Sequence, residues 1–303
     1  MKSIFKSTIY IIIIGCFFSC HPKLAPQGSL NRESTDSRGN AMLLGTCTKE
    51  RLEQKPYSDW FIKNYSDYNI DTAAAEKLKE KLSGKKFLIF MGTWCGDSRR
   101  EVPRLYKLFD YCGIKPAQVQ LIMLDNRDSV YKQSPTHEER GLNIHRVPDL
   151  LIFEKNREIG RIVESPVASL ERDLLAIANK EKYTPHFQAV SLLIELFREK
   201  SIQDIESNLT ALTDEVKPLT KNTSELNTYG YVLMAAGEKE KAKVAFKLNT
   251  LLYPGNANAF DSMGEYYFKT GNKMLAEENY RKSLQLQPAN DHAAKMLEQL
   301  QNK

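Results

Sequence analysis

The sequence predicts an α/β domain followed by an all-α domain. Between residues 86 and 180, short apolar segments alternate with amphipathic ones, as in a sheet whose strands are joined by helices. Beyond residue 222 no strand-like segment remains, and helical segments repeat with a fixed period. With 303 residues, 42% of them hydrophobic, the chain is long enough to build two cores.

The first twenty residues have the pattern of an export signal. Lys2 and Lys6 precede an apolar stretch, Thr8–Phe18, that is too short to span a membrane comfortably. A small residue and then Cys20 follow it, which resembles the signal of bacterial lipoproteins. We therefore predict a signal peptide over 1–19, a lipid on Cys20 and attachment to a membrane surface through that lipid. Cleavage before Cys16, or a plain signal in which Cys20 has no role, is the alternative.

Residues 20–45 have linker composition, and we expect them to be flexible. The α/β domain is expected over 46–180. Aromatic residues at helical spacing, among them Trp60, Phe61 and Tyr65, predict a helix within 57–68 that covers a core face rather than a substrate groove. A second helix is expected over 73–82, after Asp71.

The rest of this domain is expected to alternate strands and helices. Strands are predicted at 87–91, 119–124, 150–153 and 158–163, and the last two form an antiparallel hairpin. Helices are predicted at 95–109, with Pro103 inside, and at 167–178. The polar residues 126–143 are expected to be loop-like.

Two blocks near the C-terminus repeat with a period of 34 residues. Six residue pairs share this offset: Gly230/Gly264, Gly237/Gly271, Ala242/Ala276, Phe246/Tyr280, Pro254/Pro288 and Asn256/Asn290. The period is that of tetratricopeptide (TPR) helix–turn–helix units. We predict two such repeats and a C-terminal helix over 223–303. Residues 181–222 are expected to form a helical connector. Because such arrays need about three units, its helical stretch Phe187–Leu212 is expected to pack against the repeats, although it shows no TPR consensus.

Cys95 is the candidate reactive residue. It stands between a buried strand and a helix start, where unpaired backbone N–H groups and the helix dipole favour a thiolate. The five cysteines show no metal-ligand spacing, so neither a metal nor another cofactor is predicted. A net charge of +5 without a basic stripe argues against nucleic acid as a partner.

Three short segments frame this cysteine: Thr93-Trp94-Cys95-Gly96-Asp97-Ser98, Val102-Pro103 and Arg146-Val147-Pro148. Together they resemble the thioredoxin superfamily over about residues 45–180, and most of all the envelope thioredoxin-like and TlpA-like proteins of Bacteroidetes. The resemblance implies that Cys95, next to Trp94, attacks a disulfide. It also implies that Pro148 is a cis-proline and that the Val147–Pro148 backbone binds the substrate.

The same resemblance implies where the protein works and with what. The expected location is the cell envelope of a Gram-negative bacterium, as a periplasm-facing or surface lipoprotein. The expected partners are protein thiols and disulfides, together with a protein or peptide bound by the repeats.

Several positions depart from the family pattern. Ser98 stands where dithiol members carry a resolving cysteine; its hydroxyl is expected to hydrogen-bond the Cys95 thiolate, but it forms no disulfide. Ile89 replaces a buried acid, and Asp149 follows the proline where threonine is common. His145 is either a proton carrier for Cys95 or an exposed loop residue.

Two functions remain open at this stage. The first is monothiol exchange or isomerisation through Cys95, which tolerates the loss of a resolving cysteine. The second is a non-catalytic scaffold that binds client proteins. Cys112, seventeen residues after Cys95, and Cys47, before the domain core, do not obviously restore a dithiol cycle.

Overall fold

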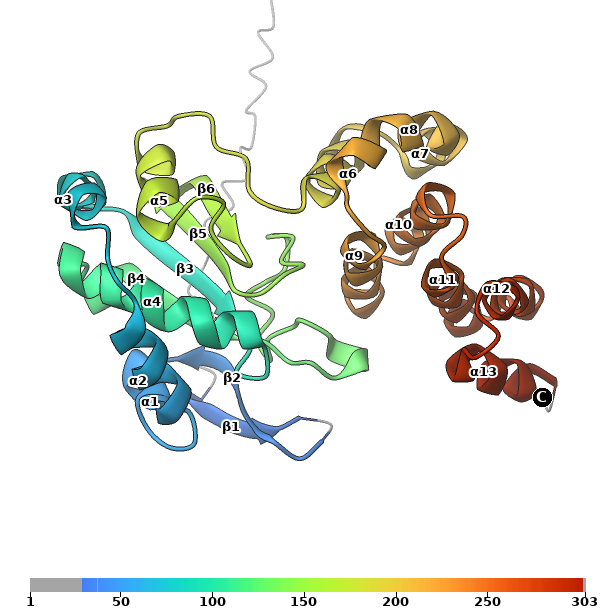
Figure 1. Ribbon diagram of the computed structural model, residues 1–303, viewed down its shortest axis with the longest axis horizontal. Helices are drawn as coiled ribbons and strands as arrows, with labels where there is room; N and C mark the ends of the chain where they lie inside the picture. The colour runs from blue at the N-terminus through green and yellow to red at the C-terminus, as the bar shows by residue number, and fades with distance from the viewer. Residues whose placement is uncertain (1–28, 37, 302–303) are drawn as a thin grey trace, which may run out of the picture.

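The computed structural model describes residues 29–36 and 38–301 (Figure 1). The predicted signal peptide and Cys20 lie outside these residues. Within them, no helix is both long and apolar enough to cross a bilayer. The chain forms an α/β region with a mixed sheet, followed by an all-helical region, as the sequence predicts at this level.

The sheet has six strands in the order β1-β2-β4-β3-β5-β6. The strands are β1 (Arg32–Thr35), β2 (Ala41–Cys47), β3 (Lys86–Met91), β4 (Val119–Met123), β5 (Asp149–Glu154) and β6 (Arg157–Val163). β3 pairs in parallel with β4 and antiparallel with β5. The strands β5 and β6 form the predicted antiparallel hairpin.

The expectation of a flexible linker over 20–45 is wrong for its second half. β1 and β2 form an antiparallel hairpin, and β2 extends the sheet by pairing with β4. The Asp36 carboxylate accepts the backbone N–H groups of Arg38 and Asn40 in the turn. Buried Met42, Leu43 and Leu44 supply the apolar contact that a linker lacks. The α/β region therefore begins before residue 46.

One face of the sheet is covered by helices. Two short 3-10 helices lie elsewhere, η1 (Pro116–Gln118) just before β4 and η2 (Asp128–Val130) in the segment between β4 and β5. The covering helices are α1 (Lys49–Leu52), α2 (Ser58–Asp67), α3 (Thr72–Lys81), α4 (Gly96–Cys112) and α5 (Leu170–Ala178). Their apolar residues share a core with Ile89 of β3, and Phe61 of the aromatic segment is buried in it. Its burial confirms that the aromatic helix covers the core.

The opposite face of the sheet carries a second, smaller core. Phe90 of β3 points into it, because successive strand residues face opposite sides. Among the residues that the structure describes, no helix of the α/β region contributes to this core; Leu142, Ile144 and Val147, from the segment between β4 and β5, cover it instead. This segment is loop-like, as predicted.

The C-terminal region is entirely helical. Its elements are α6 (Gln188–Glu199), α7 (Ile202–Ser207), α8 (Leu209–Val216), η3 (Lys217–Leu219), α9 (Ser224–Ala235), α10 (Lys239–Leu252), α11 (Ala257–Thr270), α12 (Lys273–Leu286) and α13 (Asp291–Gln301). Residues of α6 to α8 share a core with α9 and α10. The connector therefore packs against the repeats, as expected.

The 34-residue period corresponds to two equivalent helix pairs, α9–α10 and α11–α12. Gly230 of α9 lies against the ring of Phe246, and Gly264 of α11 lies against Tyr280. A Cβ at these positions would be 2.5 Å and 2.8 Å from the nearest ring atoms. Glycine is therefore required for these two close helix contacts.

Substituting Gly230→Ala or Gly264→Ala should lower the free energy of unfolding by about 1–3 kcal/mol. The gain in helix propensity is smaller than the cost of displacing a buried ring. Urea unfolding followed by circular dichroism measures this. Gly255→Ala, where a Cβ meets nothing within 4 Å, is the matched control and should change little. Equal stability of all three variants would contradict the packing argument.

Candidate functional site

Cys95 lies where β3, α4 and the segment before β5 meet. It is the N-cap residue of α4, with an extended backbone, and its N–H donates to Gly92 O at 3.0 Å. Its thiol donates to the carbonyl of Val147 at 3.3 Å. The Val147–Pro148 peptide bond is cis, as the resemblance implies. The structure thus brings the predicted residues Cys95, Val147 and Pro148 together.

Trp94 is held beside the cysteine by a hydrogen bond and by its ring packing. Its Nε1–H donates to Leu124 O at 2.8 Å, at the end of β4. The indole ring lies directly over Gly92, where an added Cβ would be only 2.3 Å from the ring. Gly92 therefore allows the tight turn between the strand and the helix.

The Ser98 hydroxyl makes a hydrogen bond that the sequence did not predict. Its side chain is fully buried, and its hydroxyl accepts the backbone N–H of Gly92 at 3.3 Å, whereas no hydrogen bond to Cys95 is found among the described contacts. Side chains in the first turn of a helix lean back toward its N-terminus, here toward the end of β3. Ser98 therefore fixes the strand–helix turn that carries Cys95.

The other two described cysteines lie in the protein interior. Cys47 and Cys112 are free thiols that donate to the backbone carbonyls of Thr48 and Ala75. Burial raises the pKa of Cys47 to about 12 and that of Cys112 to about 11. Both stay protonated at neutral pH, so neither is suited to resolve a disulfide on Cys95.

A buried lysine near the thiol was not identified from the sequence. Lys132 is 5% exposed, and its Nζ donates to the hydroxyl of Tyr131 at 2.8 Å. The same ammonium lies 5.3 Å from the centroid of the Trp94 ring. A lysine in a polar loop is normally exposed, and no local pattern in the sequence marks this one as buried.

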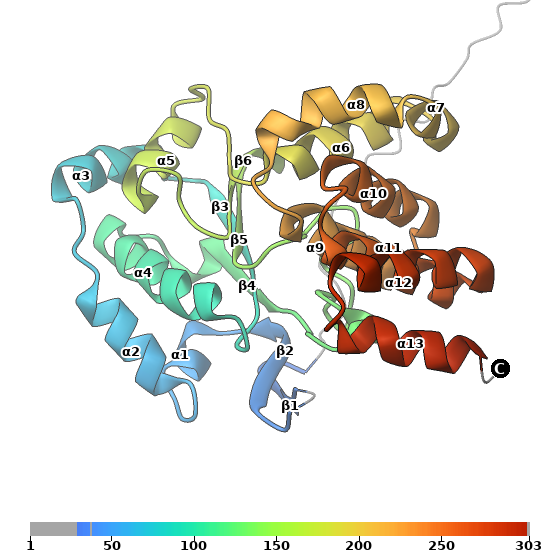
Figure 2. The same ribbon diagram turned by 45° about the vertical axis from the view of Figure 1, so that its right-hand side comes forward.

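Residues just before the cis-proline contact the helical region. Arg146 donates to Ser224 O at 2.9 Å, lies 3.4 Å from Glu164 and stacks 4.6 Å from the centroid of Phe187. The contact brings the segment between β4 and β5 against α9, and Figure 2 shows the helical region lying beside that side of the sheet. The helical region therefore supports the loop that carries Val147 and Pro148.

His145 fits neither of its expected roles. It is 3% exposed, with its ring 5.8 Å from both Phe187 and Tyr229, so the exposed-loop interpretation is wrong. Its Nδ1–H donates to Asn143 O, and its buried Nε2 has no partner. Burial lowers the pKa of His145 to about 3. The ring stays neutral at physiological pH and is unsuited to carry protons for Cys95.

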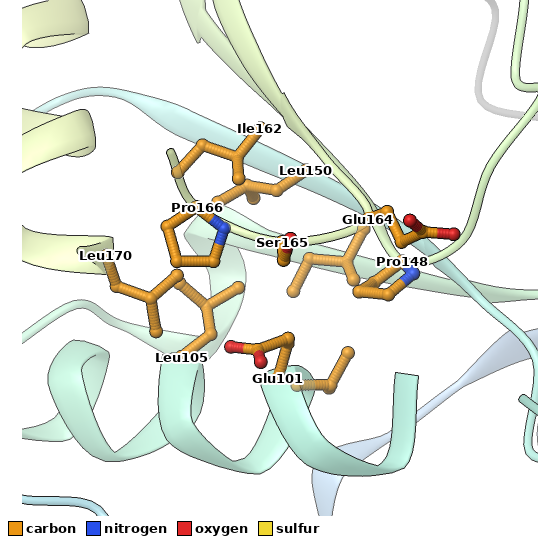
Figure 3. A pocket seen from close by; sticks show the side chains of 11 residues that line it. Glu101, Leu105, Pro148, Leu150, Ile162, Glu164, Ser165, Pro166 and Leu170 are labelled. Atoms are coloured by element: carbon orange, nitrogen blue, oxygen red, sulfur yellow. The ribbon is translucent and has the colours of Figure 1, made fainter. Parts of the chain in front are cut away.

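A small apolar cavity of about 20 Å³ lies beneath Pro148, on the face covered by α4 (Figure 3). Pro148 and Glu164 stand at one end of it, and Glu101 reaches in from α4. Ile89, which replaces the acid of the family pattern, also lines this cavity. Space of this size holds about one water molecule.

An acid is buried on the other side of the sheet. Asp149 is fully buried, with Oδ2 3.4 Å from Arg161 Nη1 and Oδ1 without a partner. Burial raises the pKa of Asp149 to about 7. It follows Pro148 directly in the chain, so the segment next to the thiol carries a carboxyl group that titrates near neutral pH.

Neither a known family model nor a curated protein matches this chain. The function is therefore argued from the geometry around Cys95. That geometry places one accessible thiol at a helix start and beside the backbone of a cis-proline. The other two described thiols are buried.

The buried His145 should make stability depend on acidity. The folded state keeps this imidazole neutral, whereas the unfolded state protonates it below about pH 6.5. Its stabilising contribution is complete above that value and is lost as the pH falls toward 3. Between about pH 7 and pH 4.5, the free energy of unfolding of wild type should fall by roughly 2 kcal/mol more than that of His145→Asn.

Urea unfolding at several pH values tests this expectation. His137→Asn makes the same substitution at an exposed position and is the matched control; because it keeps His145, it should still lose stability as the pH falls. Parallel curves for wild type and His145→Asn would show that His145 is not kept neutral by folding.

Proposed function

We propose that the chain carries a thioredoxin-like α/β domain and acts in thiol–disulfide exchange or isomerisation through the single thiol of Cys95. The observation that carries the proposal is the position of this thiol. It caps the N-terminus of α4 and lies 3.3 Å from the carbonyl of a cis Val147–Pro148 peptide. A half-exposed thiol at a helix start is accessible to a client disulfide.

The proposed reaction moves a disulfide without net oxidation. Cys95 loses its proton to solvent, and the thiolate attacks one sulfur of a client disulfide. A bond forms between Cys95 and that sulfur, the client disulfide breaks, and the released client thiolate takes up a proton. A second thiol, from the client itself or from a small thiol in solution, then attacks the mixed disulfide and releases Cys95.

The surroundings of the thiol favour this one-cysteine cycle. Ser98 has no sulfur, and its hydroxyl is engaged with Gly92. Cys47 and Cys112 are buried. When Cys95 is bonded to a client, the carbonyl of Val147 loses its S–H donor and is left to accept a backbone N–H of an extended client segment.

The helical region is proposed to consist of tetratricopeptide repeats that bind a protein or peptide partner. The equivalent glycine–aromatic contacts of α9–α10 and α11–α12 support this proposal. Export and lipid attachment at Cys20, and with them a place in the cell envelope, are proposals that rest on the pattern of residues 1–20 alone.

A non-catalytic scaffold is the second candidate. The thiol of Cys95 already donates to Val147 O, and the family's resolving cysteine and buried acid are replaced by Ser98 and Ile89. In that case the α/β region holds client proteins without reacting with them.

Exchange of a glutathione mixed disulfide on a test peptide separates the two candidates. Wild type should accelerate it, and Cys95→Ser should return the rate to the uncatalysed background because the nucleophile is lost. Cys112→Ser, which removes a buried thiol, is the matched control and should keep the wild-type rate. Equal rates for wild type and Cys95→Ser would leave the scaffold as the better proposal.

The Ser98→Cys variant should gain a reaction that wild type lacks. A thiol three residues after Cys95 lies on the same side of α4 and supplies the missing resolving group. We expect this variant to catalyse insulin reduction by dithiothreitol, measured as turbidity, while wild type runs no faster than Cys95→Ser. Adding Cys95→Ser to the variant should abolish the gain. A variant that folds but shows no gain would contradict the assignment of Ser98 to the resolving position.

A further inference from the structure

Lys132 is a buried cation without a carboxylate partner. Besides the hydrogen bond to the Tyr131 hydroxyl, its Nζ lies 4.3 Å from the centroid of the Tyr131 ring and 5.3 Å from that of Trp94. Among the described residues, the hydroxyl and the two rings are its contacts, and no carboxylate forms an ion pair with it. Burying an unpaired charge is costly, and aromatic rings offset only part of that cost.

The backbone holds this side chain in the interior. Lys132 has a φ of +56°, an unfavourable conformation for a residue with a Cβ. Its N–H donates to Asp125 O, and the N–H of Asp125 donates to Gln133 O, both at 2.9 Å. The Asp125 carboxylate is occupied by Arg127. These backbone hydrogen bonds fix the turn from which the Lys132 side chain enters the interior.

The charges near Lys132 leave one candidate for its counter-ion. Burial and the Arg146 guanidinium lower the pKa of Lys132 to about 8, whereas Cys95 and Glu164 act in the opposite direction. Glu164 lies 3.4 Å from Arg146 and is already paired with it. Cys95 follows Trp94, over whose ring the Lys132 ammonium lies, and both residues pack against the same small core. Its sulfur is the remaining one of the two groups that oppose the lowering, and it gains a negative charge when it ionises.

We propose that Lys132 is the counter-ion of the Cys95 thiolate and a positioning residue for its reaction. The ammonium lies over the ring of Trp94, next in the chain to Cys95, and adds to the positive end of α4. The inference deepens the proposed function and rests on it. No extra chemical step is involved: the proton of Cys95 still goes to solvent, and Lys132 keeps its own protons.

The pH profile of Cys95 alkylation tests the proposal. The full chain is treated with iodoacetamide at a series of pH values, and the modified Cys95 peptide is followed by mass spectrometry. Lys132→Met keeps the length of the side chain and removes its charge. The midpoint of the profile should then rise by about one to three pH units. Lys132→Arg should restore most of the wild-type profile, because it restores the charge.

Lys85→Met is the matched control. Lys85 is also a buried lysine, but it is paired with Glu154 at 2.8 Å. Removing the charge of Lys85 should leave the midpoint of the Cys95 alkylation profile unchanged. An unchanged midpoint in Lys132→Met would overturn the proposal, as would an equal shift in Lys85→Met. A shift in Lys132→Met that Lys132→Arg fails to reverse would assign the effect to packing and would also overturn it.

If Lys132→Met does not fold, a reciprocal measurement on the Lys132 amine tests the proposal instead. By linkage, removing the anion in Cys95→Ser should lower the pH at which the Lys132 amine reacts with acetic anhydride, read from the Lys132 peptide. Identical profiles in wild type and Cys95→Ser would overturn the proposal. These readouts use no client disulfide. A failure of the counter-ion proposal is therefore distinguishable from a failure of glutathione exchange.

Discussion

The geometry around Cys95 depends on how β3 is buried. This strand pairs on both edges, in parallel with β4 and antiparallel with β5, and both of its faces are covered. Ile89 packs into the helix-covered core and Phe90 into the smaller one. Because both edges are paired and both faces are covered, the C-terminal end of β3 has little freedom to move. Cys95, which follows the strand after one tight turn, is therefore also held in a fixed position.

That turn is maintained by three mutually dependent contacts. Gly92 leaves room for the Trp94 ring, Trp94 is tied to the end of β4, and Ser98 binds the N–H of Gly92. None of these groups takes a chemical part in the exchange proposed for Cys95. Their effect is to hold the sulfur beside the Val147 carbonyl, so that a client segment would meet the thiol and the cis-proline backbone together.

The second face of the sheet connects the thiol to the helical region. In the described part of the chain, the segment between β4 and β5 covers this face in place of a helix of the α/β region, and this segment packs in turn against α9. Arg146 and His145 make that contact one residue or two before Val147. The helical region therefore lies next to the loop that carries Val147 and Pro148.

Local patterns in the sequence determined much of this arrangement. The apolar run before Cys95, the alternation of later strands and helices, and the 34-residue period each depend on residues close together in the chain. Pro103, Pro148 and the helix start at Cys95 are also recognised from residues close together in the chain. The sequence therefore located β3, α4, the hairpin of β5 and β6 and the repeated helix pairs.

Only the tertiary structure decided the features that depend on distant contacts. The hairpin of β1 and β2 joins the sheet because Cys47 pairs with Leu121 of β4, although its sequence reads as a linker. His145 is neutral because Tyr229 and Phe187 bury it, and Lys132 is buried because it packs on Trp94. Burial of a charged or polar side chain is set by what packs over it, and that partner lies far along the chain.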